Sequence, residues 1–578
     1  MRSSEPCRRR LNLPAGTVLF CATAAFVLWQ NAHLTVLWDL SYILENANRI
    51  ALGQLPYRDF PFPYAPLTFL TQAAIIRLTG HAIWHHSLYA AAAAGFATLL
   101  TWRILLRVLT PSPLPARLLA FALAAPMVFL GTSSIFPHPF YDADCTLLIL
   151  FCLWTLLKLE EKDLPRLPAL ACGALLVLPL LTKQNTGLAF LLSAVACLAW
   201  LALKKTLRVP HPSRSCWGGV VDFASGLRCG LVLAGTLTAC AFAIAAIQLT
   251  VGLHNYLRWT IHFAASRRLP AFSSIVDIYR DPALLAGYLT FTAGAALIHC
   301  LPASRLRWLA AALLCFPFAN ALAGLFRFTD PADRVEPLLH LWPVLLLASI
   351  VVALVQLPRA RSIAQLLPLI LLGAIHGAFL SQQLWGSTYA LWPMLTILFA
   401  SVLAALSRRQ SNARPLTAAA IFASIVLMIT GAYYALSHER LDYVDLDGPL
   451  RHSRLPSLRG LALAGDWLPD FEELADYAAR EIPPGDAILS IPGEDLFYFT
   501  TGRTPQFPVV MMDNTVNPYS AAELASLARQ RNVGWLVVKR RLQLQEEPIP
   551  FRARLLDLLS RDFIPAASLN NYDIYRRR

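Results

Sequence analysis

Charged residues are scarce in this sequence of 578 residues. They make up 15% of the chain, whereas hydrophobic residues make up 56% and the mean hydropathy is +0.51. Soluble domains carry about 25% charged residues, so the composition excludes a soluble globule and indicates an integral membrane protein. The net charge of +14 does not indicate nucleic-acid binding, because the basic residues form short clusters between apolar runs, as cytoplasmic loops do.

Other signals are also missing from the sequence. Most of the eleven cysteines lie in apolar segments or in loops expected in the cytoplasm, and none follows Cys315, so no disulfide framework is indicated. The histidines lack the spacing of zinc ligands. The sequence has no Gly-rich nucleotide loop, no internal repeat and no pair of Gly/Pro-broken spans in corresponding halves, and the last two absences weaken a transporter interpretation.

Long apolar runs fill residues 1–436. They do not alternate as barrel strands would, and a helix of about 20 residues crosses a bilayer core of about 30 Å. The first run has the basic flank of a signal sequence but continues past it, so we expect an uncleaved helix. The runs predict an α-helical polytopic module of about thirteen spans, near 11–31, 84–107, 116–134, 144–158, 166–182, 187–203, 229–252, 283–300, 307–325, 338–357, 366–381, 389–406 and 416–436.

Segment 64–80 decides the topology. It is apolar, but it carries Arg77 and follows a proline-rich loop. If it does not span, basic clusters such as Arg103 and Arg107 all fall on the cytoplasmic side, as the positive-inside rule requires. We therefore expect a re-entrant or interfacial helix here, within a first external loop at 31–80. An odd number of spans then places the C-terminal tail outside the cytoplasm.

The tail at 437–578 differs from the rest in composition. Runs of strand length, "DAILSIP" and "VGWLVVK", alternate with the helix-like segments "DFEELADYAAREI" and "SAAELASLARQR". This alternation predicts a small extracytoplasmic α/β domain. Two roles remain open for it: a rigid cap on the outer face, or recognition of an acceptor.

Several short motifs occur in an order typical of one enzyme superfamily. "WDLSYILENANRIALGQLPYRDF", "FYDADCTLLIL" and "LLTKQNTG" are followed by the weaker matches "RFTDPADRVEPLLHLWPVLL" and "QQLWGSTYALWPML", and then by "YFTTGRTPQ" in the tail. Together they resemble the GT-C glycosyltransferases that use polyprenyl-phosphate sugars, in the branch of the bacterial lipopolysaccharide-core and lipid A glycosyltransferases, related to protein O-mannosyltransferases. One departure is that Leu40 follows Asp39, where many relatives have a second acidic residue.

The resemblance implies a multi-pass enzyme of the inner (plasma) membrane with a periplasmic C-terminal domain. It would transfer a sugar, with inversion, from a polyprenyl-phosphate donor to an extracytoplasmic acceptor: lipopolysaccharide, another cell-envelope glycan or a protein. The implied partners are therefore the donor lipid, the acceptor and membrane lipids, without nucleic acid.

Three aspartates in the external loops are the candidate catalytic residues. Asp39 is the candidate general base, because a base must take the proton of the acceptor hydroxyl and a partly desolvated aspartate suits that task; the alternative is that it caps a helix beginning at Leu40. Asp142 and Asp144 could orient the acceptor, share a divalent cation with Asp39, or cap the helix that begins near 144. The need for a metal cofactor stays open.

Lysine and arginine side chains are the candidate ligands of the donor phosphate. Lys183, at a membrane boundary, offers a point charge to phosphate, and the alternative is snorkelling to the lipid headgroups. Arg267, Arg268 and Arg334 are further external cations that could bind phosphate or anionic headgroups.

Two other functions compete with transfer. A transporter or flippase of lipid-linked sugars should have ionisable residues deep within its spans, whereas most charges here lie at the predicted ends. An O-antigen polymerase or ligase is a second alternative, against which the long acidic first loop and the external tail domain argue.

Overall fold

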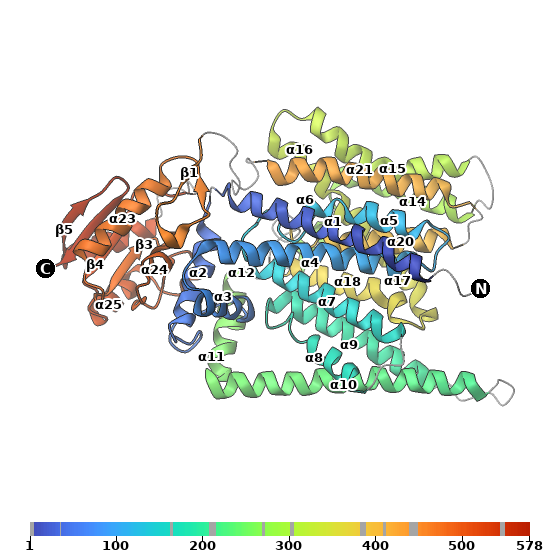
Figure 1. Ribbon diagram of the computed structural model, residues 1–578, viewed down its shortest axis with the longest axis horizontal. Coiled ribbons are helices and arrows are strands. Elements are labelled where there is room, and N and C mark those ends of the chain that lie inside the picture. Colours follow the sequence, from blue (N-terminus) through green and yellow to red (C-terminus); the bar gives the residue numbers. More distant parts are fainter. Residues whose placement is uncertain are drawn as a thin grey trace.

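A helical bundle and a smaller sheet domain lie end to end along the long axis of the computed structural model, with the two chain termini at opposite ends (Figure 1). The structure describes residues 5–34, 36–161, 166–206, 216–268, 272–300, 306–381, 389–408, 412–437, 449–543 and 550–578. Segment 382–388 of the motif "QQLWGSTYALWPML" and the beginning of the expected tail domain, 438–448, lie outside the described residues.

Apolar helices form the bundle. Within the described ranges, seven helical stretches are long and apolar enough to cross a membrane: Ile83–Leu109, Gln184–Lys204, Arg228–Thr250, Ile275–Cys300, Leu306–Arg327, Asp333–Arg359 and Arg414–Leu436. Each of them coincides with one of the spans expected from the sequence. Five of these stretches lie in single helices, and two run through a pair of helices, α13 with α14 and α16 with α17. The helices are α4 (Ile83–Leu109), α9 (Gln184–Thr206), α10 (Cys216–Thr250), α13 (Phe272–Asp277), α14 (Leu285–Cys300), α15 (Leu306–Arg327), α16 (Pro331–Leu339), α17 (Leu341–Gln356) and α21 (Arg414–Leu436).

The other expected spans are shorter, interrupted or more polar helices. They are α1 (Glu5–Asn31), α5 (Ala116–Ala124) with α6 (Met127–Leu130), α7 (Tyr141–Glu161), α8 (Arg166–Leu175), α18 (Ile363–Phe379) and α20 (Trp392–Ser407). Prolines explain two of the interruptions, because proline lacks an N–H group and clashes with the preceding helical turn. Pro126 follows the end of α5, and Pro179 lies four residues beyond the end of α8.

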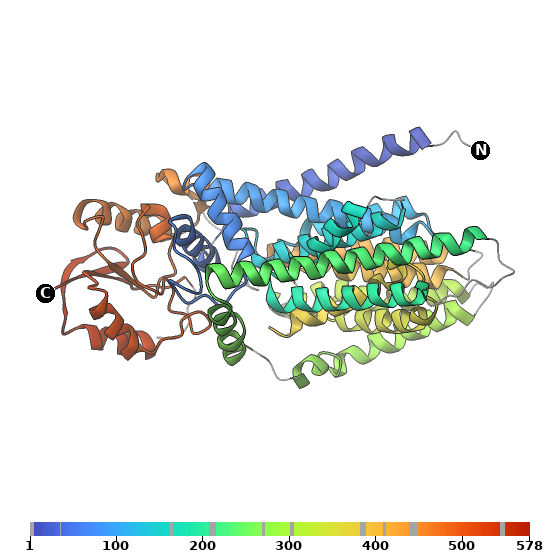
Figure 2. The same cartoon turned by 90° about the horizontal axis from the view of Figure 1, so that it is seen from below.

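Glycines allow α8 and α10 to approach closely. A Cβ atom on Gly173 would lie 1.9 Å from the carbonyl oxygen of Val232, and one on Gly235 would lie 2.1 Å from that of Leu170. Small residues at such contacts are typical of helix pairs in membranes. Figure 1 shows α10 along the lower edge of the bundle, and Figure 2, seen from below, shows it in green across the face nearest the viewer.

Two helices of the first loop, α2 (Trp38–Ala51) and α3 (Leu67–Thr79), lie between the bundle and the sheet domain (Figure 1). The thirteen residues of α3 extend about 20 Å, less than the bilayer core of about 30 Å, which agrees with the non-spanning helix expected at 64–80. Residues 40–50 of α2 are all buried. The polar first loop is therefore not an open surface loop but the joint between the two parts of the molecule.

The C-terminal part is a four-stranded sheet with helices. Its strand order is β3 (Ile488–Ile491), β4 (Trp535–Lys539), β6 (Tyr572–Arg577) and β5 (Phe563–Ser568), with β3 parallel to β4 and the other pairs antiparallel. The remaining elements are β1 (Arg451–His452), β2 (Ala462–Leu463), α23 (Trp467–Glu481), α24 (Phe497–Thr501), α25 (Ala521–Gln530) and α26 (Pro550–Leu559). The predicted fold class, a polytopic helical module followed by a small α/β domain, is confirmed.

Candidate active site

Helix α7 begins at Tyr141, three residues before the start expected from the sequence. Asp142 and Asp144 therefore both lie in its first turn, where the positive end of the helix dipole favours acidic side chains. Neither residue precedes the helix, so the alternative that they cap it is wrong. Successive positions i and i+2 differ by about 200° around a helix, and the two carboxylates accordingly have different partners.

Asp142 is ion-paired with Lys183, the residue that precedes α9. Its second carboxylate oxygen accepts a hydrogen bond of 2.9 Å from the hydroxyl of Tyr389, in the turn before α20. Only 8% of the Lys183 side chain and 5% of the Asp142 side chain are exposed, so the pair lies where water screens charges weakly. The alternative that Lys183 snorkels to the headgroups is wrong.

Asp144 contacts α3 and α4. One carboxylate oxygen accepts a hydrogen bond of 2.7 Å from Thr68, and the other accepts one of 2.9 Å from Tyr89. These bonds hold the beginning of α7 against two neighbouring helices. Within the described part of the chain, no cluster of three or more His, Cys, Asp or Glu residues could hold a metal ion.

Asp39 is the second residue of α2, whose N-cap is Leu37. Because Asp39 lies inside the helix and no side chain caps α2, the alternative that Asp39 is the N-cap is wrong. The backbone N–H of Leu37 donates a hydrogen bond of 2.8 Å to the side chain of Gln543. The partly buried Asp39 faces a cavity of about 30 Å³ at the junction of the first loop, α7 and the sheet domain. The cavity is lined by Trp38, Asp39, Tyr42, Ile43, Tyr64, Phe140, Tyr141, Met511, Asp513, Thr515 and Val516.

Two tyrosines connect Asp39 with the buried ion pair. Tyr141 lines the cavity beside Asp39, and the centroid of its ring lies 5.7 Å from the Lys183 ammonium. Tyr389, which donates to Asp142, also lies within electrostatic range of Asp39. The Asp39 carboxyl group and the Lys183 ammonium thus both lie near the ring of Tyr141, and we treat them as a single candidate site.

The sheet domain closes this site because α2 is docked onto it. Glu45 accepts hydrogen bonds from the backbone N–H groups of Tyr498 (2.8 Å) and Phe499 (3.2 Å). Arg49 donates to the carbonyl oxygen of Pro508 at 2.9 Å. Burial raises the pKa of Glu45 to about 8, although the two amide donors oppose the shift, and burial lowers the pKa of Arg49 to about 10.

The other predicted phosphate ligands do not join this cluster in the described contacts. Arg267 is exposed, and its guanidinium lies 5.5 Å from the ring centroid of Phe263. Arg334 donates to the carbonyl oxygen of Phe328 at 2.8 Å and to the hydroxyl of Tyr433 at 3.3 Å, so it links α16 to α21. The side chain of Arg268 lies outside the description.

No protein-family model and no curated protein matches this sequence. Among solved structures, the chain is similar to ArnT from Cupriavidus metallidurans bound to undecaprenyl phosphate, at 14% identity and a TM-score of 0.44 over 97% of each chain. It is also similar to the oligosaccharyltransferase AglB from Archaeoglobus fulgidus in complex with an inhibitory peptide and a dolichol-phosphate, at 14% identity and a TM-score of 0.40, over 92% of this chain and 70% of that one.

The sequence did not single out Tyr389 or Asp513. For Tyr389 a signal was present, because it lies in the motif "QQLWGSTYALWPML", whereas no local pattern marks Asp513 as a neighbour of Asp39.

Proposed function

We propose that this chain is a membrane glycosyltransferase that moves a sugar from a polyprenyl-phosphate donor to an acceptor outside the cytoplasm. The observation that carries the proposal is the buried Lys183–Asp142 ion pair beside the cavity of Asp39. A cation for a phosphate and a base for a hydroxyl are the two groups that this transfer needs, and they adjoin at the junction of the bundle and the sheet domain.

Lys183 is the proposed ligand of the donor phosphate. An ammonium has three N–H donors, and the ion pair with Asp142 fixes the direction of one of them. The other two can be directed to phosphate oxygens in a setting where charge pairing is strong. Asp142 and Tyr389 are then positioning residues, because they hold the lysine rather than the substrate.

Asp39 is the proposed general base. The acceptor oxygen attacks C1 of the sugar, the bond between C1 and the phosphate oxygen breaks, and its electron pair leaves with the polyprenyl phosphate. The acceptor proton passes to the Asp39 carboxylate. Attack from the face opposite the leaving phosphate inverts the configuration at C1.

The sheet domain supplies the proposed acceptor side. Asp513 and Thr515 line the cavity together with Tyr42 and Tyr64, so hydrogen-bonding groups and aromatic rings meet there, as in sites that orient small polar ligands. This arrangement favours acceptor recognition over the role of an inert cap, and it fits a glycolipid, glycan or protein hydroxyl as the acceptor.

The proposed location of the site is the outer face of the inner membrane. The basic residues Arg103 and Arg107 lie toward the end of α4, and the sheet domain adjoins the opposite end of the bundle (Figure 1), which the positive-inside rule places outside. Alkaline phosphatase fused after Arg578 should be active, and green fluorescent protein fused there should be dark. The reverse result would place the tail in the cytoplasm.

The test of the proposed activity is donor cleavage by the purified full chain. Liposomes containing the protein, a panel of polyprenyl-phosphate sugars and an envelope glycolipid extract should release polyprenyl phosphate, and mass spectrometry should find one added sugar in the extract. Transbilayer movement of the donor with its sugar–phosphate bond intact would instead identify a flippase. If every donor stays intact and on its own side, both functions are excluded.

A further inference from the structure

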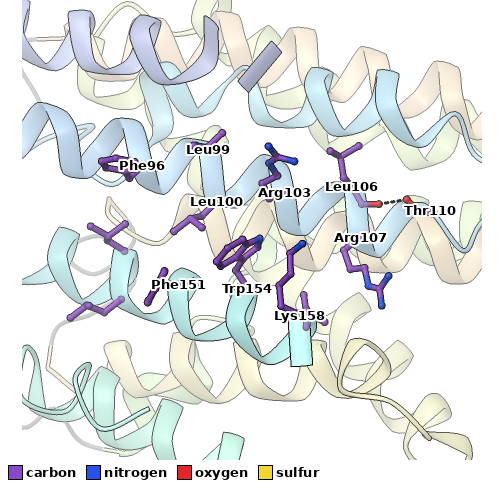
Figure 3. Close-up of a pocket in the computed structure, with 13 residues that line it drawn as sticks. Phe96, Leu99, Leu100, Arg103, Leu106, Arg107, Thr110, Phe151, Trp154 and Lys158 are labelled. Carbon is purple, nitrogen blue, oxygen red and sulfur yellow. Dashed lines mark hydrogen bonds between the residues drawn. The ribbon is translucent and has the colours of Figure 1, made fainter. Parts of the chain in front are cut away.

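A second cavity, of about 870 Å³, lies between α4 and α7, away from the candidate active site (Figure 3). Asp142 lies at the beginning of α7 and its partner Lys183 precedes α9, whereas the α7 residues that line this cavity belong to its middle and its end. The volume is within the range of sites that hold whole small molecules, about 300–1,000 Å³.

One end of the cavity is basic and the rest is apolar. Arg103 and Arg107 are one helical turn apart on α4 and lie on the same face, and Lys158 of α7 lines the cavity with them. Figure 3 shows the three basic side chains at one end and the rings of Phe96 and Phe151 toward the other. No carboxylate is among the lining residues.

The cavity has the depth of one leaflet. Phe96 and Arg107 are eleven residues apart on α4, which corresponds to about 16 Å along the axis. That is about half of the hydrocarbon core of about 30 Å. The cavity is also open at its side, because 51% of Phe96 is exposed and the side chains of Arg103 and Lys158 are exposed as well. A molecule from the surrounding leaflet can therefore enter it sideways.

We propose that this cavity binds one anionic phospholipid of the leaflet at the end of the bundle opposite the sheet domain. The phosphate lies between Arg103, Arg107 and Lys158, and a hydrocarbon chain follows Phe151 and Trp154. Charge complementarity selects an anionic headgroup, and the depth of one leaflet selects an ordinary acyl chain over a longer prenyl chain. The site is distinct from the proposed donor site and does not depend on the proposed reaction.

Lipid retention by the purified full chain tests this proposal. Native mass spectrometry should show one phosphatidylglycerol retained in preference to phosphatidylcholine. Because each basic residue near an anionic headgroup strengthens binding about fivefold, the variant R103Q/K158Q should bind phosphatidylglycerol about 25-fold more weakly. The matched control is R117Q/R166Q, which removes two exposed arginines that follow α4 and α7 in the chain but do not line the cavity, and it should bind as the wild type does.

A second measurement locates the acyl chain. Phosphatidylglycerol with brominated chains should quench the fluorescence of Trp154, so the quenching should be smaller in Trp154→Phe than in the wild type. Three results would each overturn the proposal in favour of simple snorkelling of the basic side chains. They are equal lipid retention by R103Q/K158Q and the wild type, a loss of retention in R117Q/R166Q as large as in R103Q/K158Q, and no preference for phosphatidylglycerol over phosphatidylcholine. Preferential retention of polyprenyl phosphate would overturn the choice of a phospholipid.

Discussion

Lys183 and Asp142 form an ion pair in which less than a tenth of either side chain is exposed. The two residues are 41 positions apart in sequence and meet where α7 and α9 begin. Burying two charges costs several kcal/mol for each ion unless they neutralise one another. The ion pair therefore serves both stability and the proposed function. The same contact neutralises the two buried charges and orients the Lys183 ammonium for the proposed binding of the donor phosphate.

Lys183→Met should destabilise the protein by about 3–5 kcal/mol, because it leaves the Asp142 carboxylate buried and unpaired. The double variant Asp142→Asn/Lys183→Met removes both charges and should recover most of that loss, while donor binding stays weak in both. Thermal unfolding in detergent and donor-binding titrations measure the two effects separately. If the double variant regains donor affinity along with stability, Lys183 does not bind the phosphate.

Tyr89→Phe should lower the free energy of unfolding by about 1–3 kcal/mol, the cost of removing one hydrogen bond from a buried charged group. Asp144→Asn should have a similar effect, because Asp144 holds α7 against its neighbours. Both variants should keep transfer within about tenfold of the wild type per folded molecule. A loss of a hundredfold or more in Asp144→Asn, with unchanged stability, would instead support the prediction that Asp144 is a catalytic residue.

The elements that the sequence predicted well are those with a strong local pattern. "DAILSIP" and "VGWLVVK" contain β3 and β4, "SAAELASLARQR" contains α25, and "DFEELADYAAREI" covers all of α23 except its first three residues, because alternation and helical periodicity are properties of neighbouring residues. The aspartates at the start of α7 and the lysine before α9 were predicted as site residues from their motifs and their external position, and their roles stay predictions.

Partners distant in the sequence were not predicted. Tyr389 is 247 residues from Asp142, and Tyr498 is 453 residues from Glu45. The burial of α2 was missed for this reason, since its polar side chains suggest a solvated loop until the sheet domain supplies their hydrogen-bonding partners. Periodicity indicates which residues are apolar but does not indicate which distant segment covers a polar one.

Glu45 should make the stability of the protein depend on pH. Its pKa is about 8 in the folded protein, against an ordinary value of 4.5, because burial disfavours the charged form and nearby Asp495 adds to this effect. The folded state thus binds the proton more tightly than the unfolded state. The contribution of Glu45 to the free energy of unfolding is therefore fully present below about pH 4.5, and it is lost as the pH rises through about 8.

Glu45→Gln should therefore flatten the decline of the unfolding temperature between pH 5 and pH 8. Glutamine keeps an oxygen that can accept the hydrogen bonds from Tyr498 and Phe499, but it does not titrate. The matched control is the exposed Glu481→Gln, which should keep the decline of the wild type. An equally steep decline in Glu45→Gln would show that another group causes the pH dependence.

Asp513→Asn should raise the KM for the acceptor about tenfold and leave kcat nearly unchanged, because it removes one charge-assisted hydrogen bond from the proposed acceptor side. Asparagine can still accept the hydrogen bond of 2.7 Å from the backbone N–H of Thr515, so the loop should keep its conformation. Asp557→Asn, in an exposed position on α26, is the control. Unchanged kinetics in Asp513→Asn would leave the sheet domain with the role of a cap.

Asp39→Asn is the most direct test of the proposed reaction. Asparagine has the size of aspartate, and Asp39 does not cap α2, so the variant should fold and bind the donor as the wild type does. Because asparagine cannot accept the proton, the turnover number should fall about 10²-fold or more. The matched control is Asp59→Asn in the same loop: Asp59 pairs with the neighbouring Arg58 and does not line the cavity.

Asp59→Asn should keep nearly full transfer activity. If Asp39→Asn keeps more than about a tenth of the wild-type turnover, well above what the loss of a general base allows, Asp39 is not the base. The search would then pass to Asp513, the second carboxylate that lines the same cavity. It would not pass to Glu45, because that side chain is directed toward the backbone amides of Tyr498 and Phe499, within the joint between α2 and the sheet domain.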